Sequence, residues 1–138
     1  IAHKKFYDFK NIPIIGSIIN DGTVEGGDCL WINNTTLLVG ESYRTNKSGI
    51  DQLHEILKLL NIQLIPIQLQ KYNNKGSCFH LMSIISMLDH DLAIGCERLL
   101  PFDLKNILKN NGIELINLGF MEYVQIFRRS AQNILGVS

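Results

Sequence analysis

Apolar runs alternate with polar turns along most of this chain, and the pattern predicts strands interleaved with helices. Apolar residues at 29–32 and 37–39 flank an Asn-rich turn, which predicts a hairpin of two strands. Apolar residues then recur at helical spacing, and Ser48 stands where a helix would be capped. The residues on that helical face are Ile50, Leu53, Ile56, Leu57 and Leu60. Residues 63–68 predict the next strand.

The same succession recurs further along the chain. Residues 81–88 form a second apolar run, and residues 92–94 predict a strand that pairs back onto it. A helix from about Pro101 to Asn110 and a strand over 113–118 follow. Proline suits the first turn of a helix, because the N–H that it lacks would be unpaired there in any case. The chain therefore repeats one order of elements: strand, strand, helix, strand.

Two modules of this kind account for the middle of the chain. We place the first at about 23–69 and the second at about 79–118, within a partial domain of residues 1–138. The ends are expected to belong to flanking modules, with residues 1–22 closing a preceding one and 119–138 opening a following one. A single module leaves apolar surface exposed, so several are expected to stack together.

Composition narrows the function classes. Of 138 residues, 46% are hydrophobic and 19% are charged, and the formal net charge is +0. This balance lacks the electrostatic footprint of a protein that binds nucleic acid or an anionic membrane, and no apolar run is long enough to span a bilayer. Cys29, Cys78 and Cys96 match neither a disulfide framework nor a zinc site, so reduced thiols and a cytoplasmic location are expected.

Residues able to carry chemistry gather around a glycine pair and two strand ends. Glu25 and Asp28 flank the Gly-Gly pair, where the backbone can approach a ligand closely. Arg44 follows the second strand, and His80 precedes the apolar run of the next module. Carboxylates pair with planar cations, arginine clamps carboxylates, and histidine transfers protons near neutral pH. Each residue alone also fits an ordinary role, as a turn acid, a surface arginine or a structural histidine.

Four motifs, taken together, resemble one group of enzymes. They are Thr-Val-Glu-Gly-Gly-Asp at 23–28, Arg-Thr-Asn at 44–46, Phe-His-Leu at 79–81 and Arg-Leu-Leu-Pro at 98–101. In order and spacing they are similar to the guanidino-group-modifying enzymes, which include dimethylarginine dimethylaminohydrolases, arginine deiminases and amidinotransferases. The resemblance runs from about Gly22 to Leu135. It implies an α/β fold, part of a pentein-type five-bladed α/β propeller built from strand-strand-helix-strand modules.

The resemblance also implies a role for each site residue. Glu25 would hold the substrate nitrogens and His80 would pass protons, so these two are the expected catalytic residues. Arg44 would bind the α-carboxylate of the substrate, and Asp28 would be a second substrate-binding residue in the same turn. The chemistry needs neither a metal nor an organic cofactor. The expected partner is a small guanidino compound, with no nucleic acid or membrane, and a homodimer is left open.

The implied reaction is hydrolysis of a guanidino C–N bond in arginine or a substituted arginine, through a covalent cysteine adduct with histidine as acid and base. The family's nucleophilic cysteine would lie beyond Ser138, so the chain is expected to be incomplete and inactive alone. Two alternatives stay open: an amidinotransferase of the same fold, and a non-catalytic module that binds guanidino ligands. Met82 stands where deiminases carry an aspartate, which argues against strict arginine deiminase specificity.

A cysteine within the chain could replace that nucleophile only if it lies beside His80. Cys78 is two residues from His80, and on a strand the two side chains would share a face. Of the three cysteines, Cys78 is the one that could take this role, but the main expectation stays a nucleophile beyond Ser138. Cys29 and Cys96 lie in or beside apolar strands, where a thiol behaves as a small buried hydrophobe.

Overall fold

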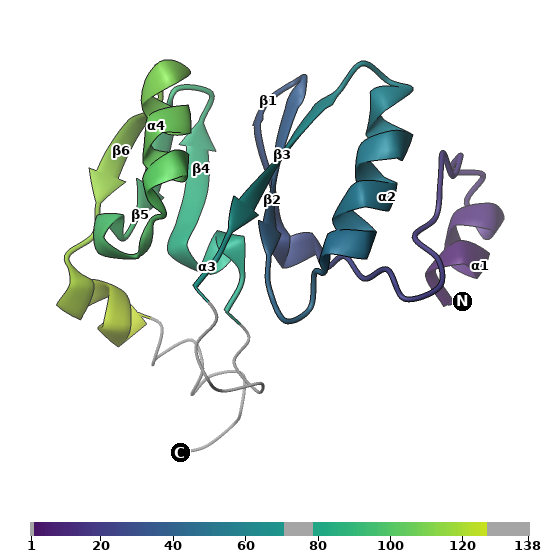
Figure 1. Ribbon diagram of the computed structural model, residues 1–138, viewed down its shortest axis with the longest axis horizontal. Coiled ribbons are helices and arrows are strands. Elements are labelled where there is room, and N and C mark those ends of the chain that lie inside the picture. Colours follow the sequence, from purple (N-terminus) through teal and green to yellow (C-terminus); the bar gives the residue numbers. More distant parts are fainter. Residues whose placement is uncertain (1, 71–78, 127–138) are drawn as a thin grey trace.

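The computed structural model describes residues 2–70 and 79–126, which fold into two small sheets with a helix for each (Figure 1). The helices are α1 (Ala2–Phe9), α2 (Lys47–Lys58), α3 (Leu81–Ile84) and α4 (Phe102–Asn110), with the short 3₁₀ turns η1 (Gly26–Asp28) and η2 (Glu97–Leu99). The strands are β1 (Cys29–Asn33), β2 (Thr36–Glu41), β3 (Gln63–Gln68), β4 (Ile85–Asp89), β5 (Leu92–Gly95) and β6 (Glu114–Asn117).

Both sheets have the same topology, in strand order β1-β2-β3 and β4-β5-β6. In each, the first two strands form an antiparallel hairpin and the third joins the second in parallel after a helix, α2 or α4. A parallel neighbour needs such a crossover, whereas an antiparallel one needs only a turn. The predicted order of strands and helices is therefore confirmed, and β3 coincides with the predicted strand at 63–68.

The larger of two hydrophobic clusters joins the two sheets. It includes Leu30 and Leu38 from the first sheet, Ile85 from the second, and Leu81 and Leu104 from α3 and α4. A smaller cluster fills the space between the first sheet and α2, where the alternate residues of β2 point. Strand β2 is consequently buried on both faces, and the loops that leave it are anchored on a rigid element.

Three helices end in the same way. Asn11, Asn61 and Gly112 follow α1, α2 and α4 with φ angles of 52°, 57° and 69°. In each case the N–H of the residue that follows this positive-φ position donates to the carbonyl five residues before it, as in the Schellman motif. The bonds are Ile12 N–H to Tyr7 O (2.9 Å), Ile62 N–H to Leu57 O (3.1 Å) and Ile113 N–H to Leu108 O (2.9 Å). Residues 2–12 thus repeat a junction that leads into a strand at the other two places.

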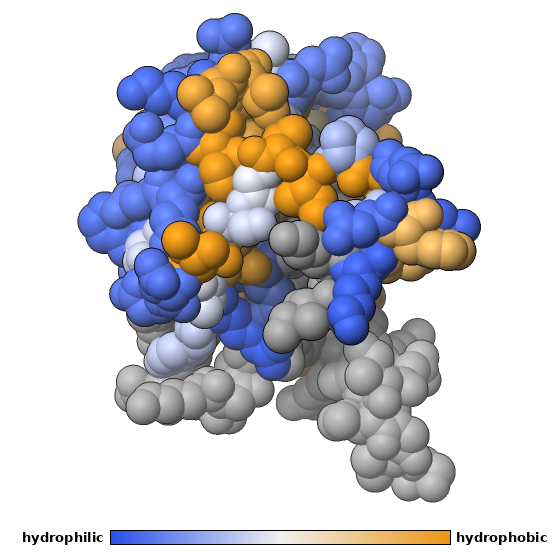
Figure 2. Space-filling model, turned by 90° about the vertical axis from the view of Figure 1, so that its right-hand side faces the viewer, coloured by the Kyte–Doolittle hydropathy of each residue, from blue (hydrophilic) through white to orange (hydrophobic). Residues whose placement is uncertain are grey.

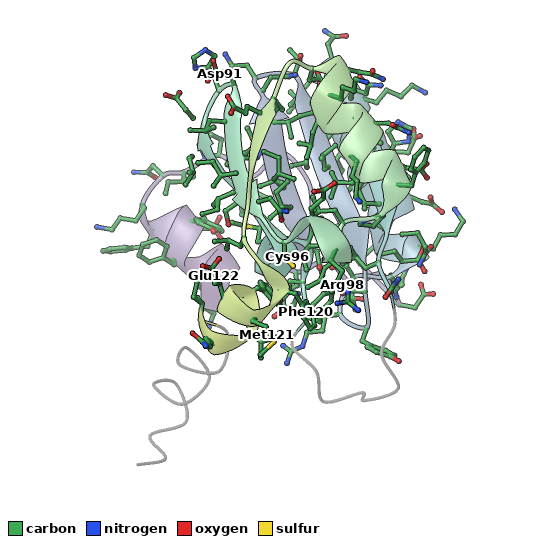
Figure 3. The ribbon with its side chains drawn as sticks, turned by 90° about the vertical axis from the view of Figure 1, so that its left-hand side faces the viewer. Asp91, Cys96, Arg98, Phe120, Met121 and Glu122 are labelled. Carbon is green, nitrogen blue, oxygen red and sulfur yellow. The ribbon has the colours of Figure 1, made fainter. Side chains whose placement is uncertain are left out.

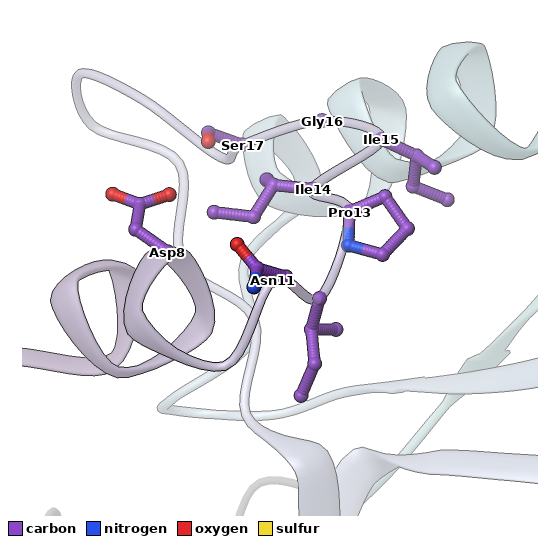
Figure 4. A pocket seen from close by; sticks show the side chains of 8 residues that line it. Asp8, Asn11, Pro13, Ile14, Ile15, Gly16 and Ser17 are labelled. Atoms are coloured by element: carbon purple, nitrogen blue, oxygen red, sulfur yellow. The ribbon is translucent and has the colours of Figure 1, made fainter.

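The chain after α1 leaves apolar side chains on the surface. Ile12, Ile14, Ile15 and Ile19 are all exposed, and apolar surface is prominent on the side of the molecule that carries α1 and α2 (Figure 2). Together with α1, this segment lines a pocket of about 680 Å³ between Asp8 and Ser17 (Figure 4). No helix was predicted here, so α1 is an addition to the expected elements.

The chain after β6 is also helical, at residues 120–126. The Arg98 guanidinium lies over the ring of Phe120, 4.8 Å from its centroid, and so connects this helix to η2 (Figure 3). Among residues 2–70 and 79–126, no helix combines the length and the apolar character that a membrane span requires.

The start of α2 differs from its prediction. The cap is Asn46, not Ser48, because the Asn46 Oδ1 accepts the Gly49 N–H at 2.8 Å. The helix also ends at Lys58, so Leu60 lies beyond it and is exposed. Asn46 secures the preceding segment as well, since its Oδ1 accepts a hydrogen bond from the N–H of Thr23.

The prediction of a strand over 81–88 is wrong for its first half. Residues 81–84 form the single helical turn α3, and β4 begins only at Ile85. A residue outside this apolar run stabilises the turn: the Leu81 N–H donates to the buried Asp28 carboxylate at 3.1 Å. A run of apolar residues does not distinguish a buried helical turn from a buried strand.

Candidate functional site

The glycine pair forms the turn η1, which carries the two acids into the site. Glu25 precedes the turn in an extended conformation, and its N–H donates to the Thr45 Oγ1 at 3.0 Å. Asp28 closes the turn with an N–H bond to the Glu25 carbonyl at 3.0 Å. The two carboxylates therefore leave the turn in fixed directions, Glu25 towards solvent and Asp28 towards the core.

The loop after β2 is held by its own hydroxyl groups. The Ser42 Oγ accepts the N–H groups of Arg44 and Thr45 at 3.0 and 3.1 Å. The Ser42 N–H in turn donates to the Thr45 carbonyl at 2.9 Å. This tight turn fixes the backbone of Arg44 beside η1.

Asp28 is completely buried, at 0% exposure, and its carboxylate is surrounded by donors. Oδ2 accepts the hydroxyls of Ser42 and Thr45, each at 2.7 Å, and Oδ1 accepts the Leu81 N–H. A buried carboxylate needs such hydrogen bonds to offset its lost hydration. Asp28 thereby connects η1, the loop after β2 and α3, although those segments are far apart in sequence.

His80 lies between the two acids. Its Nε2 is 3.5 Å from Glu25 Oε2, and its Nδ1 is 3.3 Å from Asp28 Oδ2. The Nδ1 contact is close enough for an ion pair, but Nδ1 is buried without an aligned hydrogen-bond partner, so we describe it as electrostatic. Only 17% of the His80 side chain is exposed. A β-carbon on Gly27 would lie 3.1 Å from its ring, which explains the second glycine of the pair.

Arg44 reaches back to Glu25 over the rim of the site. Its Nη1 is 3.0 Å from Glu25 Oε1 and 3.4 Å from Oε2, so one guanidinium nitrogen contacts both carboxylate oxygens. The two side chains are 51% and 40% exposed. The structure thus brings Glu25, Asp28, Arg44 and His80 together, and Glu25 is the acid that pairs with the guanidinium of Arg44.

Two buried hydroxyl residues of this site were not singled out from the sequence. Ser42 and Thr45 are both buried, and both donate to Asp28. The signal available was their place on either side of Arg44 in a turn, where hydroxyls commonly bond nearby backbone. That signal does not reveal a partner 14 or 17 positions away.

The thiols within the described residues do not supply an activated nucleophile. Burial, and then the negative charge of Asp28, raise the pKa of the Cys29 thiol, which donates to the Glu25 carbonyl at 3.7 Å. Cys29 is half-buried, whereas Cys96 is fully buried, as expected for a small hydrophobe. Cys78 lies outside the described residues. A thiol that stays protonated is a poor nucleophile, so the Glu25–His80 pair lacks an evident thiolate partner here.

A second group of titratable residues lies at the turn between β4 and β5. Asp89, His90 and Asp91 are exposed, and within the described part of the chain they are the one group whose ligand atoms gather closely enough to hold a metal ion. Hydrogen bonding to Asp89 and the charges of both aspartates raise the pKa of His90. These ion pairs account for the cluster, which we treat as an exposed acidic turn. Elsewhere, His54 is exposed on α2 and Met82 is exposed on α3.

Comparison with known proteins gives this site a family context. A sequence model of the arginine deiminase family matches residues 2–103. An uncharacterised protein of Aeropyrum pernix is 32% identical over 114 residues, which are 83% of this chain and 36% of that protein. The arginine deiminase of Streptococcus sanguinis is 28% identical over 92 residues, 62% of this chain and 22% of the enzyme. The chain therefore spans about a third or less of the length of these relatives.

A solved structure agrees with the sequence match. It is a crystal structure of a His-to-Gly variant of dimethylarginine dimethylaminohydrolase, as an adduct with S-methyl-L-thiocitrulline. The TM-score is 0.56 at 25% identity, over 72% of this chain and 35% of that one. The pentein-type α/β fold expected from the motifs is thereby confirmed. With nearly three quarters of its residues matched by the family's sequence model, the chain belongs to the arginine deiminase family.

Proposed function

We propose that this chain carries the guanidinium-binding and proton-transfer part of a hydrolase that cleaves a guanidino C–N bond of arginine or a substituted arginine. The observation that carries the proposal is the contact between Glu25 and His80, 3.5 Å apart at a site where a guanidinium already rests on Glu25. Carboxylate and imidazole are the two groups that this reaction needs beside a thiolate.

In the proposed mechanism, Glu25 binds the substrate guanidinium beside His80. A cysteine thiolate outside the described residues adds to the guanidinium carbon and forms a C–S bond. The tetrahedral adduct collapses when His80 gives a proton to one nitrogen, which leaves as ammonia or an amine. Water then attacks the remaining S-linked carbon, gives its proton to His80, and releases citrulline and the thiol. The reaction therefore consumes one water molecule and regenerates the cysteine and the protonated His80.

Asp28 receives a different role from the one first expected. It has no exposed surface with which to touch a substrate, and three donors already surround its carboxylate. We assign it the positioning of His80 and of the loop that carries Arg44. Arg44 keeps the proposed role of binding the substrate's carboxylate, for which its guanidinium has to leave Glu25.

The proposal is tested on the whole protein by replacing His80 with alanine and following citrulline release from arginine and methylated arginines. Loss of a general acid and base reduces turnover by about 10²- to 10⁴-fold. His54→Ala is the matched control, because His54 is exposed on α2 and is expected to leave turnover unchanged. Equal rates in the His80 and His54 variants would refute the assignment. An amine acceptor added to the assay separates hydrolysis from amidino transfer.

A second function is favoured by one observation on the described cysteines: burial raises the pKa of the Cys29 thiol, and Cys96 has no exposed surface. A chain of this kind can bind guanidino ligands without turning them over. Residues 1–138 alone are therefore expected to form no citrulline, while still binding arginine at Glu25. Measured turnover by residues 1–138 would identify a nucleophile within them, with Cys78 the first to replace.

We also propose how this chain fits the whole protein. The modules extend over about 23–69 and 79–118, and the ends belong to flanking modules. The helix end at Asn11, which repeats those at Asn61 and Gly112, supports the assignment of α1 to a preceding module. A cytoplasmic location and a homodimer complete the proposal, and the mass of the native protein tests the second of these.

A further inference from the structure

The Glu25 carboxylate is occupied by a group that is chemically the same as the proposed substrate. Arg44 carries a guanidinium, and its Nη1 contacts both oxygens of Glu25 at 3.0 and 3.4 Å. A carboxylate in this geometry is already engaged with a planar cation. An incoming guanidinium therefore has to replace the one that the chain itself provides.

The exchange requires a side chain to move and leaves the backbone in place. The Arg44 N–H is bonded to Ser42 Oγ, and the neighbouring Thr45 hydroxyl is bonded to the buried Asp28. These bonds hold the loop, whereas the paired side chains of Arg44 and Glu25 are about half exposed. Ion pairs exposed to this extent are only modestly favoured over the separated groups. The internal pair is thus weak enough for a ligand to displace.

We propose that Arg44 is a specificity-determining residue that competes for Glu25 and thereby selects guanidino compounds that also carry a carboxylate. This inference rests on the proposed function, because it takes Glu25 as the partner of the substrate guanidinium. When arginine binds, its guanidinium takes Glu25 and its carboxylate pairs with the displaced Arg44, so one ion pair becomes two. When agmatine binds, which is arginine without the carboxylate, Arg44 loses Glu25 and gains no new anion from the ligand.

The size of the effect follows from the strength of the internal pair. Exposed pairs of this kind correspond to a closed-to-open ratio of about 1.4 to 5, so Glu25 is available in roughly a sixth to two fifths of the molecules. Apparent affinity for a ligand that needs Glu25 falls by that fraction. Removing the Arg44 guanidinium should therefore tighten agmatine binding by about two- to six-fold.

The experiment compares Arg44→Gln with the unaltered chain, using agmatine and L-arginine as probes. Dissociation constants come from NMR shifts of the backbone amides of Glu25 and His80. We expect agmatine to bind about two- to six-fold more tightly to the variant. L-arginine should bind no more tightly to the variant than to the unaltered chain, because the carboxylate of the ligand then has no Arg44 guanidinium to pair with. The agmatine-to-arginine ratio of dissociation constants should fall accordingly. An agmatine affinity that is unchanged or weaker in Arg44→Gln would overturn the inference.

Two controls separate charge from competition. Lys47→Gln removes the same charge from an exposed side chain that pairs with Asp51, and is expected to leave the ratio unchanged. Arg44→Lys keeps the charge but loses the planar fork, so its ratio should lie between those of the other chains. If Lys47→Gln lowers the ratio as much as Arg44→Gln does, bulk charge explains the effect and the inference fails.

A third variant distinguishes this inference from the proposed function. Glu25→Gln removes the anion that both guanidinium groups would share, so it should weaken both ligands. If Glu25→Gln changes neither affinity, Glu25 is not the guanidinium partner and both proposals fail. If it weakens both ligands while Arg44→Gln leaves agmatine unchanged, the proposed function stands and only the competition by Arg44 is refuted.

Discussion

Replacing Asp28 with alanine is expected to destabilise the chain far more than replacing any exposed aspartate. Its carboxylate accepts the hydroxyls of Ser42 and Thr45 and the N–H of Leu81, all in buried positions. Hydrogen bonds to a charged group contribute about 1.5 to 3 kcal/mol each, and removing one partner leaves buried donors unpaired. Because the hydroxyls can partly re-pair and the cost of burying the charge is relieved, we expect a net loss of about 3 to 5 kcal/mol.

A loss of that size is a large share of the stability of a domain, which is about 5 to 15 kcal/mol. Urea unfolding followed by circular dichroism measures it directly. With a slope of about 2 kcal/mol per molar urea, the midpoint should fall by roughly 2 M. If Asp28→Ala does not fold, Asp28→Asn retains one acceptor oxygen and should show a smaller decrease of about 1 to 3 kcal/mol.

The matched control is Asp51→Ala, which removes an exposed carboxylate that pairs with Lys47 one helical turn away. Such pairs contribute little, so its midpoint should stay within about 0.3 M of the unaltered chain. An Asp28→Ala midpoint equally close to the unaltered chain would refute the reasoning, since it would show that the three buried donors do not depend on this carboxylate.

Two further outcomes are expected from the structure. Gly49→Ala places a β-carbon in steric conflict with the Thr23 carbonyl oxygen, so it should destabilise the chain by about 1 to 3 kcal/mol, and an unchanged melting temperature would contradict this. His90 should titrate above the ordinary histidine range because of its bond to Asp89. Its stabilising contribution is present in acid and is lost as pH rises through that raised pKa. An NMR titration in which Asp89→Asn leaves the His90 pKa unchanged would refute the pairing.

The regular elements could be predicted because their signals are local. Strand β3 has its predicted bounds, since Gln63 and Gln68 delimit a short apolar stretch after a helix stop. Helix α4 likewise begins next to Pro101. The turn α3 could not be predicted, because the group that holds it, Asp28, is 53 positions away from Leu81.

The site shows the same division between local and distant causes. The motifs brought Glu25, Arg44 and His80 forward as candidates, because carboxylate, guanidinium and imidazole have distinct chemistry. The resemblance placed Glu25 and His80 at one site, and they lie 3.5 Å apart there. The contact between Arg44 and Glu25 could not be predicted, since Arg44 was expected to face a ligand. Asp28 was expected beside the substrate, yet it is completely buried. Burial of a single turn residue depends on which loops cover it, and no spacing in the sequence records that.

The two glycines of η1 are not interchangeable. A β-carbon on Gly27 would press against the His80 ring, whereas one on Gly26 would meet no atom within 4 Å. Gly26 is therefore a suitable position for a fluorescent label. A cysteine placed there and labelled with a small fluorophore would lie next to Glu25 without disturbing the His80 imidazole. Ligand binding could then be followed by the fluorescence of this label, because η1 itself contains no aromatic residue.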